Sequence, residues 1–217
     1  ATRATCGPLL GLSSFGSDGW YDRRWATKCV RFNDDVIADL GSRAEIKTVV
    51  LASLFGQYLA GNRLIVRLPD GTEQETEGSE NLAVQGLLAT VQAVRAMGKR
   101  VVLMAPPPAA SGVDFGRCLE LKAGGQTIWG ADHSDCSMDE ARYRQGAVAV
   151  HSLLRRVSRE GDLPIFWPDE ILCHTGRCDV TIDGVPLYRD NGHLSYDGSR
   201  SLGNKLLLGE SLKQIGR

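Results

Sequence analysis

The sequence has no hydrophobic run long enough to cross a lipid bilayer. Its apolar-leaning stretches, such as Val101–Ala110, fall well short of the ~20 residues that a membrane-spanning helix needs. The sequence also lacks an excess of either charge, because 25 lysines and arginines are balanced by 26 aspartates and glutamates. We therefore predict no nucleic-acid partner and no direct insertion of this segment into a membrane.

A signal peptide is missing as well. The first residues, Ala1–Cys6, have neither a basic region nor an apolar run, which is typical of a processed or excised segment. No internal repeat, low-complexity tract or change of composition divides the chain, and 42% of its 217 residues are hydrophobic. This length and composition are sufficient for a sizeable core, so we predict one domain over residues 1–217.

Cysteine is scarce but informative, because the six cysteines fall in local pairs. Pairing between neighbours would close three short loops, each stabilising the fold by about 2–4 kcal/mol, and would indicate an oxidising compartment. Zinc is one alternative, but it usually requires tighter cysteine pairs or cysteine with nearby histidine. Six buried free thiols in a cytosolic protein are the other alternative. The favoured pairs are Cys6–Cys29, Cys118–Cys136 and Cys173–Cys178.

Short apolar runs alternate with helical patterns along the chain. Three runs have the character of buried parallel strands: Ile46–Ala52, Arg100–Ala105 and Leu163–Trp167. Four segments have helical periodicity: Phe32–Leu40, Asn81–Met97, Ser137 to about Arg159, and Tyr196–Ile215. Ser137 and Glu140 fit a capping box at the start of the third helix. This alternation predicts an α/β fold built from parallel βαβ units.

Two hairpins interrupt this plan. Asp70-Gly71, after Pro69, separates Leu64–Leu68 from Thr72–Thr76, and Asp183-Gly184 separates Val180–Ile182 from Val185–Tyr188. Asp-Gly between residues of high β propensity is a strong signal for a tight antiparallel turn. We therefore expect small antiparallel insertions beside the parallel sheet.

The most specific chemistry lies just before the last predicted helix. Asp190 and His193 are three residues apart in a loop. At this spacing the carboxylate can reach the imidazole Nδ1–H, which fixes the tautomer and leaves Nε2 as a general base. Such a base activates a serine hydroxyl and later protonates a leaving group. The pair is therefore a candidate catalytic dyad.

The stretch Asp190-Asn-Gly-His-Leu-Ser195, followed by a helix, resembles the last sequence block of the SGNH (GDSL-like) esterase and acyltransferase superfamily. The wider pattern is similar to the periplasmic SGNH domain fused to family-three membrane acyltransferases, which O-acetylate lipopolysaccharide, peptidoglycan or other surface glycans. The supporting stretches are Cys6–Leu10, Cys29–Asn33, Thr48–Tyr58, Met104–Pro108, Cys118–Cys136 and Leu172–Cys178. The resemblance implies a three-layer α/β/α sandwich with a short parallel sheet, of the flavodoxin-like type.

The resemblance also implies a function and partners. We expect a periplasmic domain, tethered to the inner membrane within a longer polypeptide, that transfers an acyl group to a glycan acceptor through a Ser-His-Asp site. The acyl donor would be delivered by a membrane acyltransferase domain of the same polypeptide, and no cofactor or metal is implied. The alternatives are a secreted carbohydrate esterase and a noncatalytic glycan-binding or scaffold domain of the same fold.

One departure from the family pattern concerns the nucleophile. The family carries it in a Gly-Asp-Ser block at the end of the first strand, and this block is missing here. Gly16-Ser17-Asp18 has the residues in another order, Leu163 follows Gly161-Asp162, and no Gly-x-Ser-x-Gly elbow occurs. We expect the first strand and its serine to lie upstream of Ala1, so that this segment alone is inactive. A true pseudoenzyme is the alternative.

The remaining candidates are less specific. The family's oxyanion hole usually uses a glycine amide and an asparagine, but no asparagine stands in Ser53–Tyr58, after the strand ending at Ala52. Gly56 or Gln57 could donate to an oxyanion there, and the alternative, which we favour, is a structural role in the loop. Two other groups of residues have ordinary explanations, in packing or in loops. They are the histidines His133, His151 and His174, and the tryptophans Trp20, Trp25, Trp129 and Trp167, which could alternatively form a sugar-stacking platform.

Overall fold

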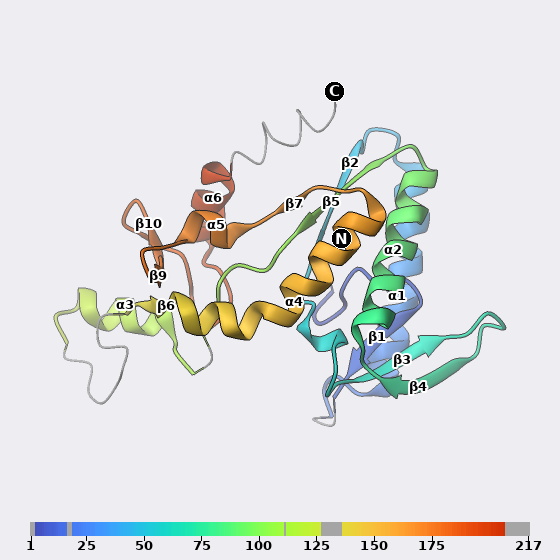
Figure 1. Ribbon diagram of the computed structural model, residues 1–217, viewed down its shortest axis with the longest axis horizontal. Coiled ribbons are helices and arrows are strands. Elements are labelled where there is room, and N and C mark those ends of the chain that lie inside the picture. Colours follow the sequence, from blue (N-terminus) through green and yellow to red (C-terminus); the bar gives the residue numbers. More distant parts are fainter. Residues whose placement is uncertain (1–2, 17–18, 111, 127–135, 207–217) are drawn as a thin grey trace. The chain divides into compact units, whose positions relative to one another are not determined.

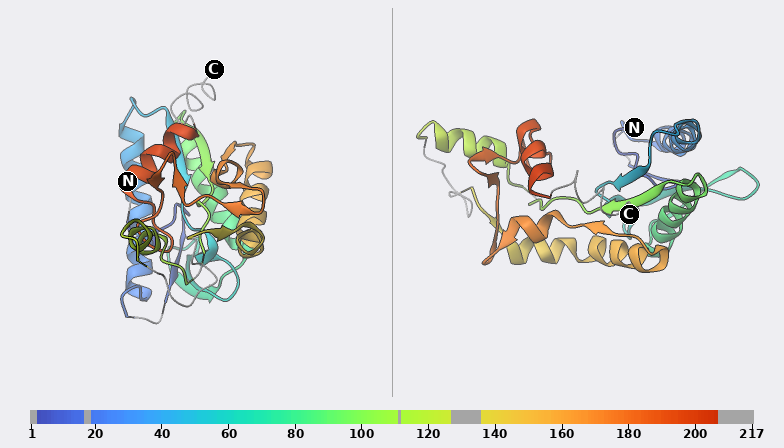
Figure 2. Two further views of the ribbon diagram at one scale, coloured as in Figure 1. Left: turned by 90° about the vertical axis from the view of Figure 1, so that its left-hand side faces the viewer. Right: turned by 90° about the horizontal axis from the view of Figure 1, so that it is seen from above.

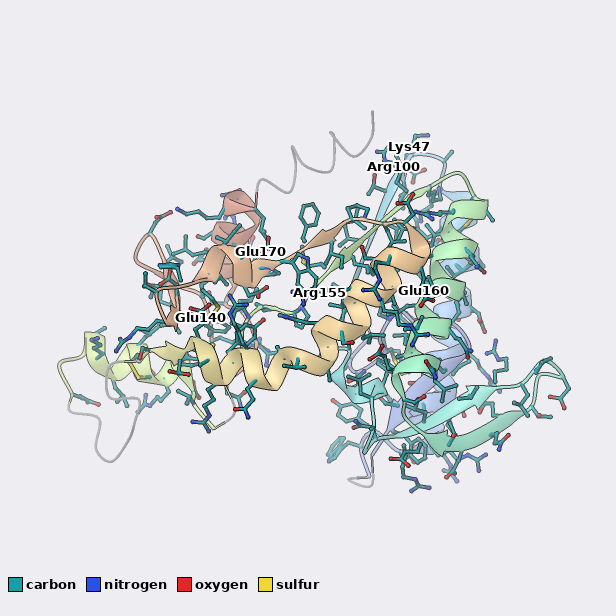
Figure 3. The ribbon with its side chains drawn as sticks, in the orientation of Figure 1. Lys47, Arg100, Glu140, Arg155, Glu160 and Glu170 are labelled. Carbon is teal, nitrogen blue, oxygen red and sulfur yellow. A yellow bond between two sulfur atoms is a disulfide. The ribbon has the colours of Figure 1, made fainter. Side chains whose placement is uncertain are left out.

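Three short parallel strands form the sheet that the apolar runs predict. In this computed structural model, which describes residues 3–16, 19–110, 112–126 and 136–206, the strand order is β2 (Thr48–Ala52), β5 (Arg100–Met104) and β7 (Ile165–Phe166). Valine and leucine occupy the centres of both strands, as is typical of parallel strands, and they are buried in β5, whereas Val50 of β2 is exposed. Figure 3 shows Lys47 and Arg100 at the amino ends of these two strands, where the Arg100 N–H donates to the Lys47 carbonyl.

The chain divides into two compact units. The first comprises Ala1–Pro106 and Ala149–Phe166, and the second comprises Pro107–Val148 and Trp167–Arg217. Helix α4 (Glu140–Gly161) contributes residues to both units. The parallel sheet belongs to the first unit, whereas Asp190 and His193 belong to the second.

Helices and a second, antiparallel sheet build the rest of the first unit. Helices α1 (Arg23–Ser42) and α2 (Glu80–Ala96) contact each other along the unit (Figure 1), and α2 also contacts β5. The antiparallel sheet has the order β1 (Leu12–Phe15), β3 (Arg63–Arg67) and β4 (Glu73–Glu77). The hairpin predicted around Asp70-Gly71 is the β3–β4 pair, which extends away from the helices in Figure 2.

Short elements around one apolar cluster build the second unit. They are α3 (Phe115–Ala123), β6 (Met138–Asp139), α5 (Pro168–Leu172), β8 (Cys173–His174), β9 (Arg177–Cys178), β10 (Thr181–Ile182), β11 (Val185–Pro186) and α6 (Tyr196–Lys205). The cluster includes Phe115, Met138, Leu172, Leu187 and Tyr188, each at most 1% exposed. Beside it, the Arg144 Nη1 donates to the buried carboxylate of Asp169 across 3.2 Å. The Nη2 of the same guanidinium pairs with Glu140, which is labelled in Figure 3.

Each of the two units contains disulfide bonds of its own. The structure contains the three bonds that neighbour pairing predicts, with Cys6–Cys29 in the first unit and Cys118–Cys136 and Cys173–Cys178 in the second. All six cysteines are therefore consumed, which leaves neither free thiols nor thiolates for zinc.

Several sequence predictions were wrong at their boundaries, for local reasons. The helix predicted over Phe32–Leu40 begins at Arg23 instead, where the Asp22 carboxylate accepts from the Trp25 N–H. The capping box at Ser137 does not form, because Met138 and Asp139 pair with β9 before α4 begins. The Asp139 side chain accepts from the Arg142 N–H in its place.

The last helix starts where the sequence predicts, whereas one other helix was not predicted. The last helix begins at Tyr196 as predicted and is described as far as Lys205, and residues 207–217 lie outside the described residues. Helix α3 was not predicted at all. The α/β class, with a short parallel sheet flanked by helices and with hairpin insertions, is confirmed.

Candidate active site

Asp190 folds its own loop around its carboxylate. Its Oδ1 accepts from the backbone N–H of Gly192 at 3.0 Å and of His193 at 2.7 Å, the local turn that short acidic side chains favour. The same carboxylate meets the imidazole of His193, whose Nδ1 lies 2.9 Å from Oδ2 and 3.0 Å from Oδ1. The loop therefore has the predicted carboxylate–imidazole contact, within hydrogen-bond reach.

These contacts determine the charge of Asp190. The N–H groups of Gly192 and His193, followed by the His193 side chain, hold the pKa of the Asp190 carboxyl far below its ordinary value. The guanidinium of Arg189 adds a contact at 3.5 Å from Oδ2. An ionised carboxylate that holds Nδ1 keeps the proton there, so Nε2 is the nitrogen left for proton transfer. The His193 side chain is 71% exposed, so its Nε2 edge is accessible.

Backbone pairing fixes the two ends of this loop. Tyr188 and Leu194 form an antiparallel bridge, and the Arg189 N–H donates to the His193 carbonyl at 3.0 Å. Ser195 then caps α6 by accepting from the Gly198 N–H, while its own hydroxyl donates to the Pro186 carbonyl at 2.7 Å. The loop thus begins after a buried tyrosine and ends at a helix cap, which leaves it little backbone freedom.

Two glycines allow helices to approach the loop closely. A Cβ added at Gly116 in α3 would lie 2.2 Å from the Arg189 carbonyl oxygen, and one at Gly198 in α6 would lie 2.4 Å from that of Leu187. Both neighbours are backbone atoms, which cannot rotate away. Only glycine therefore fits at these positions with the loop in place. The sequence interpretation missed both residues, and the available signal was a glycine in the first turn of a short helix.

The buried side chain of Tyr188 holds the start of the loop in place. Its hydroxyl donates to the Pro108 carbonyl at 2.6 Å, and its ring centroid lies 5.5 Å from that of Phe115. Burial, and then the nearby Tyr143, raise the pKa of Tyr188, so the hydroxyl stays protonated as a donor. This contact joins the loop to the segment that follows Pro106, which sequence reasoning did not link to the dyad.

The two oxyanion candidates already have hydrogen-bond partners. The Gly56 N–H donates to the Leu54 carbonyl at 2.7 Å, and the Gln57 Nε2 donates to the Thr5 carbonyl at 2.7 Å. Both lie in the short 3-10 helix η1 (Gly56–Tyr58), after a buried Phe55 at φ 58°. The structure brings Asp190 and His193 together, and it places Gly56 and Gln57 in the other unit.

The other residues singled out in the sequence are dispersed. His151 is buried, whereas His174 is exposed and lies 3.7 Å from Asp179. Trp20 is 83% exposed, and the ring of Trp25 lies under the Arg3 guanidinium. Ser17, Asp18, Trp129 and His133 lie outside the described residues. Within the described part of the chain, no group of three or more side chains could hold a metal ion.

The short parallel sheet and its flanking helices define an α/β protein, and its second unit carries the Asp190–His193 contact in the loop before the last helix. The profile of the SGNH domain (fused to AT3 domains) matches residues 1–207, and the chain belongs to this family. Among curated proteins, none matches the chain.

A solved structure supports the same fold. The chain is similar to the periplasmic domain of the lipopolysaccharide acetyltransferase of Salmonella ser. Paratyphi A, with a TM-score of 0.56 and 16% identity. The match covers 95% of this chain and 69% of that one. In the described residues, no helix is both long and apolar enough to span a bilayer.

Proposed function

We propose that this chain is the periplasmic domain of an O-acyltransferase that acetylates a surface polysaccharide, acting through a Ser-His-Asp site. The observation that carries the proposal is the contact of His193 Nδ1 with Asp190 Oδ2 at 2.9 Å. Membership of the SGNH family fused to AT3 domains supports the acyl-transfer class. The three disulfides favour an extracytoplasmic location, with tethering through the membrane domains of a longer polypeptide.

In this proposal the dyad acts as general base and then as general acid. His193 Nε2 takes the proton of a serine hydroxyl as its oxygen attacks the acyl carbonyl of the donor. The same imidazolium then gives that proton to the leaving group, and a serine ester remains. In the second half, Nε2 takes a proton from a sugar hydroxyl, which attacks the ester. Return of that proton to the serine oxygen regenerates the site. Asp190 stabilises the imidazolium at Nδ1 throughout.

The serine would be supplied by a strand outside this chain, because the Gly-Asp-Ser block is missing from its sequence. The free edge of β2 supports this placement. Among the described strands β2 pairs with β5 alone, and Val50 in this edge strand is 37% exposed. An apolar parallel strand with an open edge is unusual, since such sheets are normally covered and their edges protected. A further parallel strand along β2 would pair with this open edge and protect it.

The oxyanion donors in this proposal come from outside the described residues. The Gly56 N–H already donates to the Leu54 carbonyl, and the Gln57 side chain bonds to the Thr5 carbonyl and to Tyr58.

The test uses the longer protein that carries the membrane domains. With the serine present, it should transfer acetyl groups to a glycan, and His193→Ala should reduce that transfer to background. Transfer to water but not to glycan would favour the carbohydrate esterase. Full transfer by the His193→Ala protein would refute the role of the dyad and favour a noncatalytic scaffold.

A further inference from the structure

A cavity of about 510 Å³ lies beside the dyad loop, entirely within the second unit. One wall is α3, and the other wall is the chain that leads into Asp190, namely Pro186, Tyr188 and Arg189. Its volume falls within the range of roughly 300–1,000 Å³ that is usual for small-molecule sites. The proposed chemistry uses neither α3 nor this cavity.

The charged groups that line the cavity are balanced. Arg117 and Arg189 provide two cationic side chains, and Asp114 and Glu120 provide two anionic ones. Arg117 Nη1 is 2.7 Å from Glu120 Oε2, so donors and acceptors alternate along the wall. An anionic ligand would meet two carboxylates and a cationic one would meet two guanidinium groups. The lining therefore favours a neutral ligand that is rich in both donors and acceptors.

Apolar surface completes the cavity. Leu119 and Pro186 line it along with the charged groups, and the exposed Ala123 lies at the end of α3. Pyranose rings present hydroxyl groups at their rim and C–H groups on their faces. Arginine and carboxylate side chains can bind the hydroxyls through charge-assisted hydrogen bonds, while Leu119 and Pro186 contact the ring face.

Arg189 connects this cavity to the catalytic carboxylate. It lines the cavity, and its Nε lies 3.5 Å from Asp190 Oδ2. The close approach of Gly116 to the Arg189 carbonyl fixes the distance between the two walls. A sugar held here would therefore lie next to the residue that orients His193.

We infer that this cavity is the subsite for the neutral saccharide acceptor, with Arg117 and Arg189 as its principal donors. The inference rests on the proposed function, because the saccharide is the acceptor of that reaction. It gives α3 a role in binding the acceptor, in addition to its packing against the dyad loop.

The test measures binding by the chain itself, which needs no serine. Methyl glycosides of glucose, galactose, mannose, rhamnose and N-acetylglucosamine are titrated while amide NMR shifts are recorded. At least one should shift the amides of Gly116–Glu120 and Leu187–Arg189 and reach saturation. Arg189→Ala should weaken that binding at least about tenfold, the effect of losing a hydrogen bond to a charged group. Ala123→Trp, which fills the cavity from an exposed position, should abolish it.

Two variants serve as matched controls. Lys122→Trp places the same ring one residue away on α3, and Arg63→Ala removes an exposed arginine from the β3–β4 hairpin, so both should bind as the unaltered chain does. The inference fails if no glycoside shifts these amides, if Ala123→Trp binds normally, or if inorganic phosphate binds there more tightly than the glycosides.

A second measurement separates this inference from the proposed function. In the longer protein, Lys122→Trp should transfer normally, whereas Ala123→Trp should raise KM for the glycan acceptor. Normal transfer by that variant would overturn the subsite while the dyad stands. Glycoside binding in a protein that has no acyl-transfer activity would leave the subsite standing without the proposed reaction.

Discussion

At the scale of single residues, Asp190 does two things with one carboxylate. It closes its own loop by accepting two backbone N–H groups, and it holds the imidazole of His193. Replacing it with asparagine keeps its size but leaves an amide that can present an N–H to Nδ1 and stabilise the wrong tautomer. In the longer protein, Asp190→Asn should lower kcat by roughly 10³–10⁴-fold with little change in KM. The exposed Asn191→Ala is the control in the same loop, and equal losses in both variants would contradict the orienting role.

The same contacts predict how Asp190 responds to pH. The N–H groups of Gly192 and His193 lower the pKa of its carboxyl from the ordinary 3.8, so the charged form is favoured in the folded state. A lowered pKa means that this stabilisation is complete above the unfolded value and is lost only as pH falls through the folded one. The ¹³C resonance of the Asp190 carboxyl should therefore remain that of a carboxylate at pH 3.8, where the unfolded chain is half protonated. A midpoint at or above 3.8 would contradict the turn.

At the scale of elements, the loop is held by the helices that pack on it. A Cβ at Gly198 would lie 2.4 Å from the Leu187 carbonyl, so Gly198→Ala must push α6 away from the loop. Overpacking of this kind costs about 1–3 kcal/mol, even though alanine is the better helix former. We expect Tm to fall by roughly 2–10 °C and the His193 amide to shift.

The control for that variant is another helical glycine. Gly146 in α4 is exposed and has nothing within 4 Å of an added Cβ, so Gly146→Ala should raise the stability by up to about 1 kcal/mol. Unchanged stability and unchanged loop resonances in Gly198→Ala would show that the close contact does not constrain the dyad.

The Cys118–Cys136 disulfide should influence the position of the dyad loop, because it holds α3, which packs on that loop. Cys118 lies two residues from Gly116, which contacts the Arg189 carbonyl. Removing the bond by Cys118→Ala with Cys136→Ala frees a loop of 18 residues, which should cost about 3 kcal/mol. Denaturant unfolding measures this loss, and NMR should show shifts over Arg189–His193. Removing Cys173–Cys178, which closes a separation of only 5 residues, should cost about 2 kcal/mol.

Local signals in the sequence predict some of these elements and not others. The valine-rich runs predict β2 and β5 because a covered parallel strand must be apolar along its length. The first half of α1 is missed because the small residues Ala26 and Cys29 occupy two of its buried positions, which leaves Val30 as its one buried branched residue and weakens the periodicity. The two-residue strand β6 arises from pairing with β9, which lies far along the chain, so no local pattern can indicate it.

The dyad was predictable for the opposite reason. Asp190 and His193 meet within a single turn, so their spacing alone determines whether they can touch. The groups that position this turn, namely Gly116, Gly198 and Pro108, come from other parts of the chain. Their role follows from tertiary packing and could not be inferred from the loop.

At the scale of the whole molecule, each of the two units leads to an expectation of its own. The second unit has the Asp190–His193 contact while the sequence has no Gly-Asp-Ser block, so we expect the nucleophile to come from outside these residues. In the first unit, β2 pairs with β5 alone among the described strands, so its edge is open to one more strand.

If the nucleophile lies outside these residues, the chain by itself should have almost no activity. Without the nucleophilic serine of a Gly-Asp-Ser block, the dyad cannot form an acyl-enzyme. Hydrolysis of a small acetyl ester should therefore barely exceed background. Proteases that lose one triad member retain about 10³–10⁴-fold over water, through substrate binding and the oxyanion hole. Here even that remnant should be smaller, because the Gly56 N–H and the Gln57 side chain already have hydrogen-bond partners. Extending the chain upstream to include a Gly-Asp-Ser block should restore hydrolysis and labelling by a serine-directed fluorophosphonate. Strong labelling of the unextended chain would place the nucleophile within its own residues, and an upstream sequence without such a serine would favour a pseudoenzyme.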